Sequence, residues 1–503
     1  MEAAGRRPES GRTAAGERWL RDELGRARRV LRRVYGHADF RPEQRPVVAA
    51  MIEGRDLLAV LPTGAGKSVC FQVPALLDRR LTVVVSPLVA LMDDQASGLR
   101  QRGVHAVAAV HGGLSGRHRS EALDEAAEGG LRLLYVAPER LGSRRLEAAL
   151  GRRELGPIVV DEAHCISQWG HDFRPAYRRI GEFAASVGAP GLAAFTATAT
   201  PAVERDVVES LGLQSPARIR YPVDRPNLLW SAGRAASRRA GIGRLARLAR
   251  RCPGAAVLYV GTRRRCVRTA AALRRLGVAA APYHAGLPDR DRRTVQRAFL
   301  AGRVRAVCAT SAFGMGIDHD SVRLVAHLGI PGSLEAYVQE AGRAGRDGRP
   351  ARCHLVSVPG EVELQERLAS RHWPSPEAVR TVWRAMQPGR PLRPREVARR
   401  CRTVGPGERA GALRVLRRAG LLRRTGEGQE KRLLRAPDCL WRRVDLDELR
   451  RGRERALGRI ARVAEYAAAS GCRRAAIARH FGDPVPRSCR RCDGCAPAAG
   501  VSF

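Results

Sequence analysis

Short apolar runs alternate with amphipathic stretches from about residue 57 to residue 355. Continuously apolar strands joined by helices are typical of a parallel sheet that is covered on both faces. The runs fall into two sets, and the break between the sets lies near residues 213–225. The first set is residues 57–61, 82–86, 132–136, 157–161 and 191–195, and the second is residues 256–260, 304–309 and 324–328. The pattern therefore predicts two α/β domains in tandem, each built on a parallel sheet.

The pattern changes at both ends of the chain. The first residues are rich in Gly, Arg, Pro, Ser and Glu without periodicity, which predicts a disordered basic tail. A helical pattern then runs from Trp19 to about Tyr35. Beyond residue 356 the β-rich runs stop, and helical periodicity prevails to residue 481. We expect a tail, two α/β domains, a helical region and a last small unit, with the bounds 1–17, 18–214, 215–355, 356–443 and 444–497.

The helical region has the order of elements of a winged helix. Its second helix would pack Leu413, Leu416 and Leu421 inward, and the turn Thr425-Gly-Glu-Gly428 would form the wing. A small helical bundle is the other interpretation of residues 376–435, because helical spacing alone does not separate the two.

The charge of the chain indicates what kind of partner it binds. Its 503 residues include 90 Lys and Arg against 50 Asp and Glu, a net charge of +40. Such an excess favours a nucleic acid partner, because neutralised phosphates release their counterions; a merely solvated basic surface is the alternative. The sequence shows neither a secretory signal peptide nor an apolar run of roughly 18 residues. We expect a cytoplasmic, nucleoid-associated protein without a membrane partner.

One of the two lysines in the chain lies in the segment Thr63-Gly-Ala-Gly-Lys-Ser68, between a predicted strand and a predicted helix. This is the context of a phosphate-binding loop, whose glycines let backbone N–H groups turn toward the phosphates. A compact ammonium reaches the β- and γ-phosphates of ATP, and a serine hydroxyl binds Mg²⁺. Survival of this lysine by chance in an arginine-biased chain is the weaker interpretation. The predicted nucleotide-binding residues of the loop are Thr63, Gly64, Ala65, Gly66, Lys67 and Ser68.

An acidic motif further along the chain supports the interpretation of this loop as a nucleotide site. The apolar strand 158–160 leads directly into Asp161-Glu-Ala-His164. At the end of a parallel strand beside a phosphate-binding loop, Asp161 would hold Mg²⁺ and Glu162 would polarise the attacking water. A solvated turn is the alternative for such a motif in isolation. Its position about 95 residues after the loop favours the catalytic interpretation.

The chain has 12 cysteines, and eight of them are scattered, as buried thiols usually are. The remaining four, Cys472, Cys489, Cys492 and Cys495, gather near the end of the chain. Four thiolates with this spacing predict a tetrahedral zinc site. An iron–sulfur cluster is the competing interpretation, and disulfides do not suit a cytoplasmic protein.

The segment Cys165-Ile-Ser-Gln-Trp-Gly-His-Asp-Phe-Arg-Pro175 resembles the aromatic-rich loop of RecQ-family helicases, within superfamily two. The resemblance covers roughly residues 30–355, in the family's order and spacing. The other segments that carry it are residues 35–44, 86–95, 137–140, 194–200, 309–318 and 339–348. It implies two RecA-like domains and an ATP-dependent DNA helicase that unwinds duplexes in the 3′–5′ direction, in recombination and repair. It also implies single-stranded and partly duplex DNA as partners; we expect a monomer that meets single-strand-binding or repair proteins.

The resemblance also implies roles for residues that spacing alone does not reveal. Gln44 would hydrogen-bond the adenine edge, and Arg41 would lie near the base. Arg346 would be the arginine finger, with Arg343 as a second γ-phosphate contact and Gln339 close to the nucleotide. Four residues of the aromatic-rich loop would couple DNA binding to hydrolysis, namely Trp169, His171, Phe173 and Arg174. The cysteine cluster resembles the RecQ zinc subdomain, which favours zinc over iron–sulfur.

The chain departs from the common RecQ layout after residue 355. In that layout the zinc segment follows the second motor domain directly, whereas about 100 residues intervene here and no further helical domain is expected past Cys495. Two other functions are alternatives: an RNA-dependent ATPase with a similar motor, and a DNA-binding scaffold with a silent nucleotide site. The aromatic-rich loop and the cysteines speak against the first. The intact Lys67, Asp161, Glu162 and Arg346 speak against the second.

Overall fold

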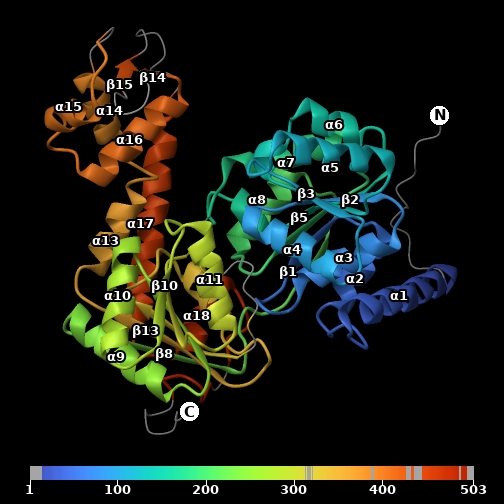
Figure 1. Ribbon diagram of the computed structural model, residues 1–503, viewed down its shortest axis with the longest axis horizontal. Coiled ribbons are helices and arrows are strands. Elements are labelled where there is room, and N and C mark those ends of the chain that lie inside the picture. Colours follow the sequence, from blue (N-terminus) through green and yellow to red (C-terminus); the bar gives the residue numbers. More distant parts are fainter. Residues whose placement is uncertain are drawn as a thin grey trace.

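A computed structural model describes residues 14–170, 172–311, 313, 319, 321–386, 390–425, 432–435, 444–486 and 489–495. The chain forms two α/β lobes side by side, with a helical extension that rises from the second lobe (Figure 1). The first helix begins at Ala14, so the end of the predicted disordered tail is helical instead. Residues 1–13 of that tail lie outside the described residues.

The first lobe contains a seven-stranded parallel sheet in the order β3-β4-β2-β5-β6-β1-β7. Alternate residues of its strands enter two different cores: Leu58 and Val60 of β1 face one, and Leu57 and Ala59 face the other. Helices α1 to α4 cover the second core, and α5 to α8 cover the first. The strands are β1 Leu57–Val60, β2 Leu81–Val85, β3 Val107–Val110, β4 Leu133–Val136, β5 Leu155–Val160, β6 Leu192–Thr196 and β7 Ala217–Arg220. The helices are α1 Ala14–Tyr35, α2 Arg45–Glu53, α3 Lys67–Leu77, α4 Val89–Gln101, α5 Gly116–Glu128, α6 Arg144–Leu150, α7 Ile180–Ser186 and α8 Pro201–Leu211.

The second lobe contains a six-stranded parallel sheet in the order β10-β11-β9-β12-β13-β8. Helices α9 and α10 cover one face, and α11 and α12 lie on the other. The strands are β8 Leu228–Arg234, β9 Ala255–Val260, β10 Ala280–Tyr283, β11 Ala306–Ala309, β12 Val322–Leu328 and β13 Ala351–Ser357. The helices are α9 Arg238–Arg251, α10 Arg263–Arg275, α11 Asp289–Leu300 and α12 Leu334–Ala341. The predicted pair of parallel-sheet domains is thus confirmed.

Each predicted apolar run overlaps a strand, but within the described part of the two lobes the pattern missed five others: β3, β7, β8, β10 and β13. β3 and β10 are short and alanine-rich, while β7, β8 and β13 interleave polar side chains. The expected boundary between residues 214 and 215 was wrong, because β7 pairs with β1 and extends the first sheet to Arg220.

After the second lobe comes a helical region, which lies in the chain between α13 (Glu361–Ala369) and α17 (Leu446–Ala468). It has a hydrophobic core of its own. It consists of α14 Pro376–Ala385, α15 Pro394–Arg400, α16 Pro406–Arg418 and the antiparallel hairpin of β14 Leu422–Thr425 with β15 Arg432–Arg435. Leu392 bridges Leu433 of the hairpin, which completes the order of a winged helix. Leu416 and Leu421 are buried as predicted, and Leu413 is half-buried. The tip of the predicted wing lies outside the described residues.

The long helix α17 connects this winged-helix region to the second lobe (Figure 1). Its C-terminal half and α18 (Arg473–Phe481) bury Ile460, Val463, Ile477 and Phe481 in the same core as α12 and β8. The segment with the four cysteines is therefore packed onto the second lobe. None of the helices in the described part of the chain is long and apolar enough to cross a membrane.

Candidate nucleotide and metal sites

The phosphate-binding loop leads from the end of β1 into α3, whose first residue is Lys67. Gly64 has φ +88° and Gly66 has φ +76°, backbone conformations that favour glycine. The first N–H groups of a helix lack intrahelical partners and carry a positive partial charge. The loop residues Thr63–Ser68 thus present backbone donors, the Lys67 ammonium and the Ser68 hydroxyl at one helix end, which fits a triphosphate.

Gln44 and Arg41 brace this loop from behind. The Gln44 side chain is buried, and its Nε2 donates to the Ala65 carbonyl at 2.7 Å. The Arg41 side chain donates to the Gly64 carbonyl at 2.6 Å, and its backbone N–H donates to Gln44 Oε1 at 3.0 Å. A Cβ atom on Gly66 would lie 2.5 Å from Gln44 Nε2, so this contact requires a glycine. The structure brings both residues to the loop, and their contact with adenine stays a prediction.

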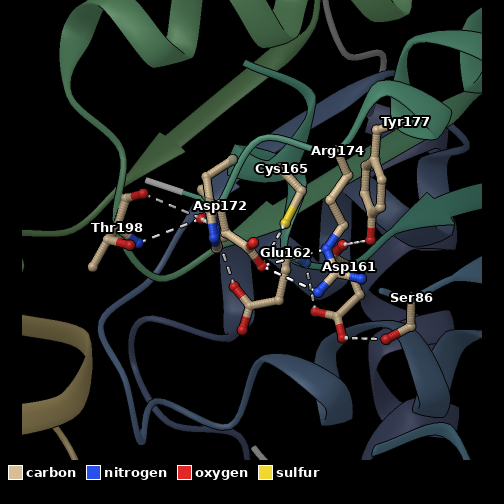
Figure 2. Close-up of polar contacts among 10 residues, drawn as sticks. Ser86, Asp161, Glu162, Cys165, Asp172, Arg174, Tyr177 and Thr198 are labelled. Carbon is tan, nitrogen blue, oxygen red and sulfur yellow. Dashed lines mark hydrogen bonds and ion pairs between the residues drawn. The ribbon is translucent and has the colours of Figure 1, made fainter. Parts of the chain in front are cut away.

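Asp161 directly follows β5, and Figure 2 shows its carboxylate beside the Ser86 hydroxyl. Its carboxylate accepts hydrogen bonds from the Glu162 backbone N–H at 3.0 Å and from Ser86 Oγ at 3.4 Å. The Tyr177 hydroxyl donates to the Asp161 carbonyl at 3.0 Å, which fixes the backbone. Burial and the neighbouring Glu162 charge raise the pKa of Asp161 to about 7, while Lys67 acts in the opposite direction. A divalent cation would stabilise this buried anion, so the carboxylate and Ser68 fit Mg²⁺.

Glu162 is held by a chain of buried polar groups. It has φ +48°, and its Oε2 lies 3.3 Å from Nδ1 of His164. The same nitrogen is 3.0 Å from Thr196 Oγ1, and the Thr196 hydroxyl lies 3.4 Å from the Thr198 carbonyl. His164 therefore links the acidic turn, residues 161–164, to the segment 194–200 at the end of β6, one of the segments that carry the family resemblance.

The second lobe reaches the phosphate-binding loop through the turn after α12. A Cβ atom on Gly64 would lie 3.5 Å from Cγ of Arg346, and a Cβ atom on Gly342 would lie 2.8 Å from Cβ of Thr63. Arg346 thus lies against the loop, and its role as the arginine finger stays a prediction. Arg343 is half-buried, and its charge lowers the pKa of the buried Tyr259 hydroxyl against the larger effect of burial. Gln339 is half-buried on α12, the helix that precedes this turn.

The aromatic-rich loop follows the acidic turn. Trp169 is 53% exposed, and Phe173 is half-buried with the Arg178 guanidinium 5.5 Å from its ring centroid. The Arg174 side chain donates to the Pro87 carbonyl at 2.6 Å. It also donates to Asp172 Oδ2 at 3.2 Å, and both of these residues are labelled in Figure 2. Arg174 therefore connects the loop to the segment 86–95. His171 lies outside the described residues.

Sequence reasoning missed two sets of contacts around this site. Gln168 and Trp169 touch α17, and Arg225, between the lobes, donates to the Gly342 carbonyl at 2.7 Å. Both depend on residues that are far apart in the chain. No local pattern distinguishes Arg225, or Arg455 of α17 that contacts Trp169, from the many other arginines of the chain.

The four predicted metal ligands converge. Cys472 is the N-cap of α18, and the sulfur atoms of Cys472, Cys489, Cys492 and Cys495 all lie within 4.8 Å of one another. The sulfurs of Cys472 and Cys492 are 3.9 Å apart, close to the spacing of about 3.8 Å that tetrahedral Zn–S bonds of about 2.3 Å require. The donor set fits zinc. The other cysteines that the structure describes are buried, and Cys439 lies outside the described residues.

Two parallel-sheet lobes that meet at one phosphate-binding loop define a superfamily-two helicase motor. Family models agree: a DEAD/DEAH box helicase model matches residues 41–206, a helicase conserved C-terminal domain matches residues 242–348, and a RecQ zinc-binding model matches residues 437–496. Among solved structures, the DUF1998 helicase MrfA bound to DNA and AMPPNP is similar with a TM-score of 0.57 at 19% identity, covering 82% of this chain and 62% of that one. That likeness concerns the fold.

Curated relatives narrow the class. The chain is 35% identical over 365 residues to the probable ATP-dependent DNA helicase RecS of Bacillus subtilis, covering 72% of this chain and 73% of that protein. It is 39% identical to the ATP-dependent DNA helicase RecQ of the same organism, covering 69% of this chain and 58% of that longer protein. The chain belongs to the RecQ family of ATP-dependent DNA helicases. It is an ATP-hydrolysing DNA helicase whose cofactors are ATP, Mg²⁺ and Zn²⁺.

Proposed function

We propose that the residues gathered between the lobes form a single ATPase site whose opening and closing moves the chain along single-stranded DNA. The contact of Arg346 with the Gly64 loop carries this proposal, because it places a second-lobe cation at the first-lobe phosphate cradle. Neither lobe alone completes the site. Binding of ATP would draw the lobes together, and hydrolysis would release them.

Each residue has a distinct role in this proposal. Lys67 and the loop N–H groups hold the β- and γ-phosphates, and Gln44 and Arg41 hold the loop and read the base. Ser68 and Asp161 would hold Mg²⁺, which would neutralise charge on the phosphates. Glu162, oriented by His164, accepts a proton from the attacking water. Arg346, with Arg343 and Gln339 beside it, stabilises the charge that develops on the γ-phosphate.

The DNA strand would contact the aromatic-rich loop, since Trp169 offers an exposed ring for stacking beside the acidic turn. Unwinding in the 3′–5′ direction, on single-stranded and partly duplex DNA, is the direction that the family implies. On the observed element bounds we assign ATP binding to residues up to 220, the catalytic arginines to residues 221–357, and stabilisation of the second lobe to residues 444–495. We propose that the protein acts as a monomer at the nucleoid, in the cytoplasm, beside single-strand-binding and repair proteins.

The experiment is ATP turnover measured with single-stranded DNA, duplex DNA and RNA, with Lys67→Ala as the inactive control. Single-stranded DNA should stimulate turnover strongly, and Lys67→Ala should abolish both basal and stimulated turnover. Equal stimulation by RNA would contradict the DNA assignment. Turnover that survives in Lys67→Ala would contradict the site itself.

A further inference from the structure

The segment between the lobes, residues 220–227, touches two parts of the molecule that the proposed mechanism leaves unconnected. We call this segment the linker. One group of its contacts reaches the zinc-binding subdomain, residues 444–495. The other reaches the turn of residues 342–349, which carries Arg343 and Arg346 and which we call the finger turn.

The zinc-binding subdomain holds the linker through buried charge. The Asp483 side chain is only 2% exposed and accepts hydrogen bonds from the Val223 backbone N–H at 2.8 Å and from Arg220 Nη2 at 2.7 Å. One residue further on, Asp224 accepts from Arg474 Nε of α18 at 2.9 Å. Removing one partner of such a buried ion pair leaves an uncompensated charge, so these contacts fix the linker firmly.

Arg225, the next residue, points to the finger turn. Its guanidinium donates to the Gly342 carbonyl at 2.7 Å and the Ala344 carbonyl at 2.9 Å, and it also donates to the Gly345 carbonyl. Asn227 adds a hydrogen bond to the Gly345 carbonyl at 2.8 Å. Carbonyl groups that follow a helix carry a negative partial charge, and a planar fork can engage several of them at once.

Arg225 also lies close to the phosphate-binding loop. A Cβ atom on Gly64 would lie 3.8 Å from Arg225 Nη1 and 3.5 Å from Cγ of Arg346. Burial and the nearby charges of Arg346 and Arg41 lower the pKa of the Arg225 guanidinium. The carbonyl hydrogen bonds offset this unfavourable position and hold the finger turn where the loop meets it.

The zinc-binding subdomain also contacts the N-terminal end of α12. His480 Nε2 lies 2.7 Å from Glu335 Oε1; the Glu335 side chain is buried, and the His480 side chain is 10% exposed. The helix before Arg346 is therefore fixed at its start by α18 and at its end by the linker.

We propose that Arg225 is a positioning residue for Arg346, and that the zinc-binding subdomain fixes the linker from which Arg225 reaches the finger turn. This inference rests on the proposed role of Arg346. A misplacement of about 1 Å in a catalytic group can lower a rate by about 100-fold. Loss of Arg225 should therefore act on the chemical step and leave DNA binding intact.

The test measures kcat and KM for ATP at saturating single-stranded DNA in Arg225→Ala and Arg225→Lys. Arg225→Ala should lower kcat by about 10- to 100-fold while the DNA affinity and Tm stay close to those of the parent protein. Arg225→Lys should be intermediate, because one ammonium does not span three carbonyls. Arg218→Ala, at an exposed position of β7, is the matched control and should leave kcat unchanged. An Arg225→Ala protein with parental kcat would overturn the inference.

A double-mutant cycle with Arg346→Ala separates this inference from the proposed function. If Arg225 acts through Arg346, then Arg225→Ala should cause no further loss of kcat in the Arg346→Ala background. Asp483→Asn should lower kcat to a smaller degree and be equally silent there. Additive losses would show that Arg225 acts on the nucleotide by itself and would overturn the positioning role. Parental turnover in Arg346→Ala would instead remove the finger from the proposed function.

Discussion

The Arg455 guanidinium of α17 lies over the Trp169 ring, 5.2 Å from its centroid. The same guanidinium donates to Gln168 Oε1 at 2.8 Å, and Gln168 Nε2 donates to Glu448 Oε1 at 2.9 Å. The aromatic-rich loop is thus held against a helix that begins almost 280 residues later in the chain. A DNA base that stacks on Trp169 must compete with this contact.

We therefore expect Arg455→Ala to sensitise the enzyme to DNA. A partly exposed cation–π contact contributes about 0.5–1 kcal/mol, so the single-stranded DNA concentration that gives half-maximal ATPase stimulation should fall by about two- to five-fold. The measurement is a titration of turnover with an oligonucleotide. Arg451→Ala, one turn earlier on the exposed face of α17, is the matched control and should change little. A higher half-stimulating concentration in Arg455→Ala would mean that Arg455 binds DNA itself.

Trp169→Ala should uncouple DNA binding from hydrolysis. The ring is exposed and lies next to the acidic turn, but it does not belong to the phosphate cradle. Basal turnover should stay, while stimulation by single-stranded DNA should fall by about ten-fold, the effect of losing one stacked base. A normal response to DNA would remove the coupling role of this loop.

Glu162→Gln should separate ATP binding from hydrolysis. The amide keeps the size of the side chain but cannot accept a proton from water, so kcat should fall by about 100-fold or more while ATP still binds. Stopped-flow binding of a fluorescent ATP analogue and steady-state turnover would measure the two effects. Glu154→Gln, on the loop before β5, offers an acidic control outside the site. Parental turnover in Glu162→Gln would show that another group activates the water.

Except for Cys472, the residues that spacing alone placed in the site lie in short segments with their partners. Gln44, Arg41 and Arg346 came from the family resemblance. Lys67 comes with its glycines, Asp161 with Glu162, and Cys489 with Cys492. Local spacing was enough to predict the kind of site. In the structure the four cysteine sulfurs lie together, and Lys67 begins α3 at the phosphate-binding loop.

The residues that sequence did not find depend on packing between distant segments. Arg225 and Arg455 are two of many arginines, and only the folded chain distinguishes them, by three carbonyl groups in one case and by an indole ring in the other. The same holds for β7, whose polar residues gave no strand pattern, although it pairs with β1. The fold class followed from periodicity, whereas the contacts between the parts of the motor did not.

Purified protein should contain about one zinc per chain by metal analysis. Because zinc binds the folded cluster, its removal by a strong chelator should cost about 3 kcal/mol at zinc levels 100-fold above Kd and lower Tm by roughly 5–10 °C. Cys492→Ser should reproduce this loss, since it removes one of the four sulfur ligands of the cluster. Cys401→Ser, at a buried position of the winged-helix region, controls for the loss of a thiol. Iron in place of zinc, with a brown colour, would contradict the assignment of the cluster.

The stability of the second lobe should depend on His354 of β13. Burial, and then the charges of Arg244 and Arg352, lower the pKa of His354 to about 4, with Asp493 acting weakly in the opposite direction and Arg473 adding to the shift. In the unfolded chain the histidine has an ordinary pKa of about 6.5. At pH values between the two pKa values, the unfolded chain therefore binds a proton that the folded lobe does not bind. Stability is therefore present above pH about 6.5 and is lost as the pH falls toward 4.

From these values, about 2 kcal/mol of the free energy of unfolding should disappear between pH 7 and pH 5 because of His354. Urea unfolding of the parent protein and of His354→Gln at pH 7 and pH 5 measures this contribution. The difference in unfolding free energy between the two proteins should change by about 2 kcal/mol from one pH to the other. His118→Gln, at an exposed position of α5, should show no such shift. Parallel pH profiles for the parent and His354→Gln would mean that His354 takes up its proton in the folded lobe as readily as in the unfolded chain.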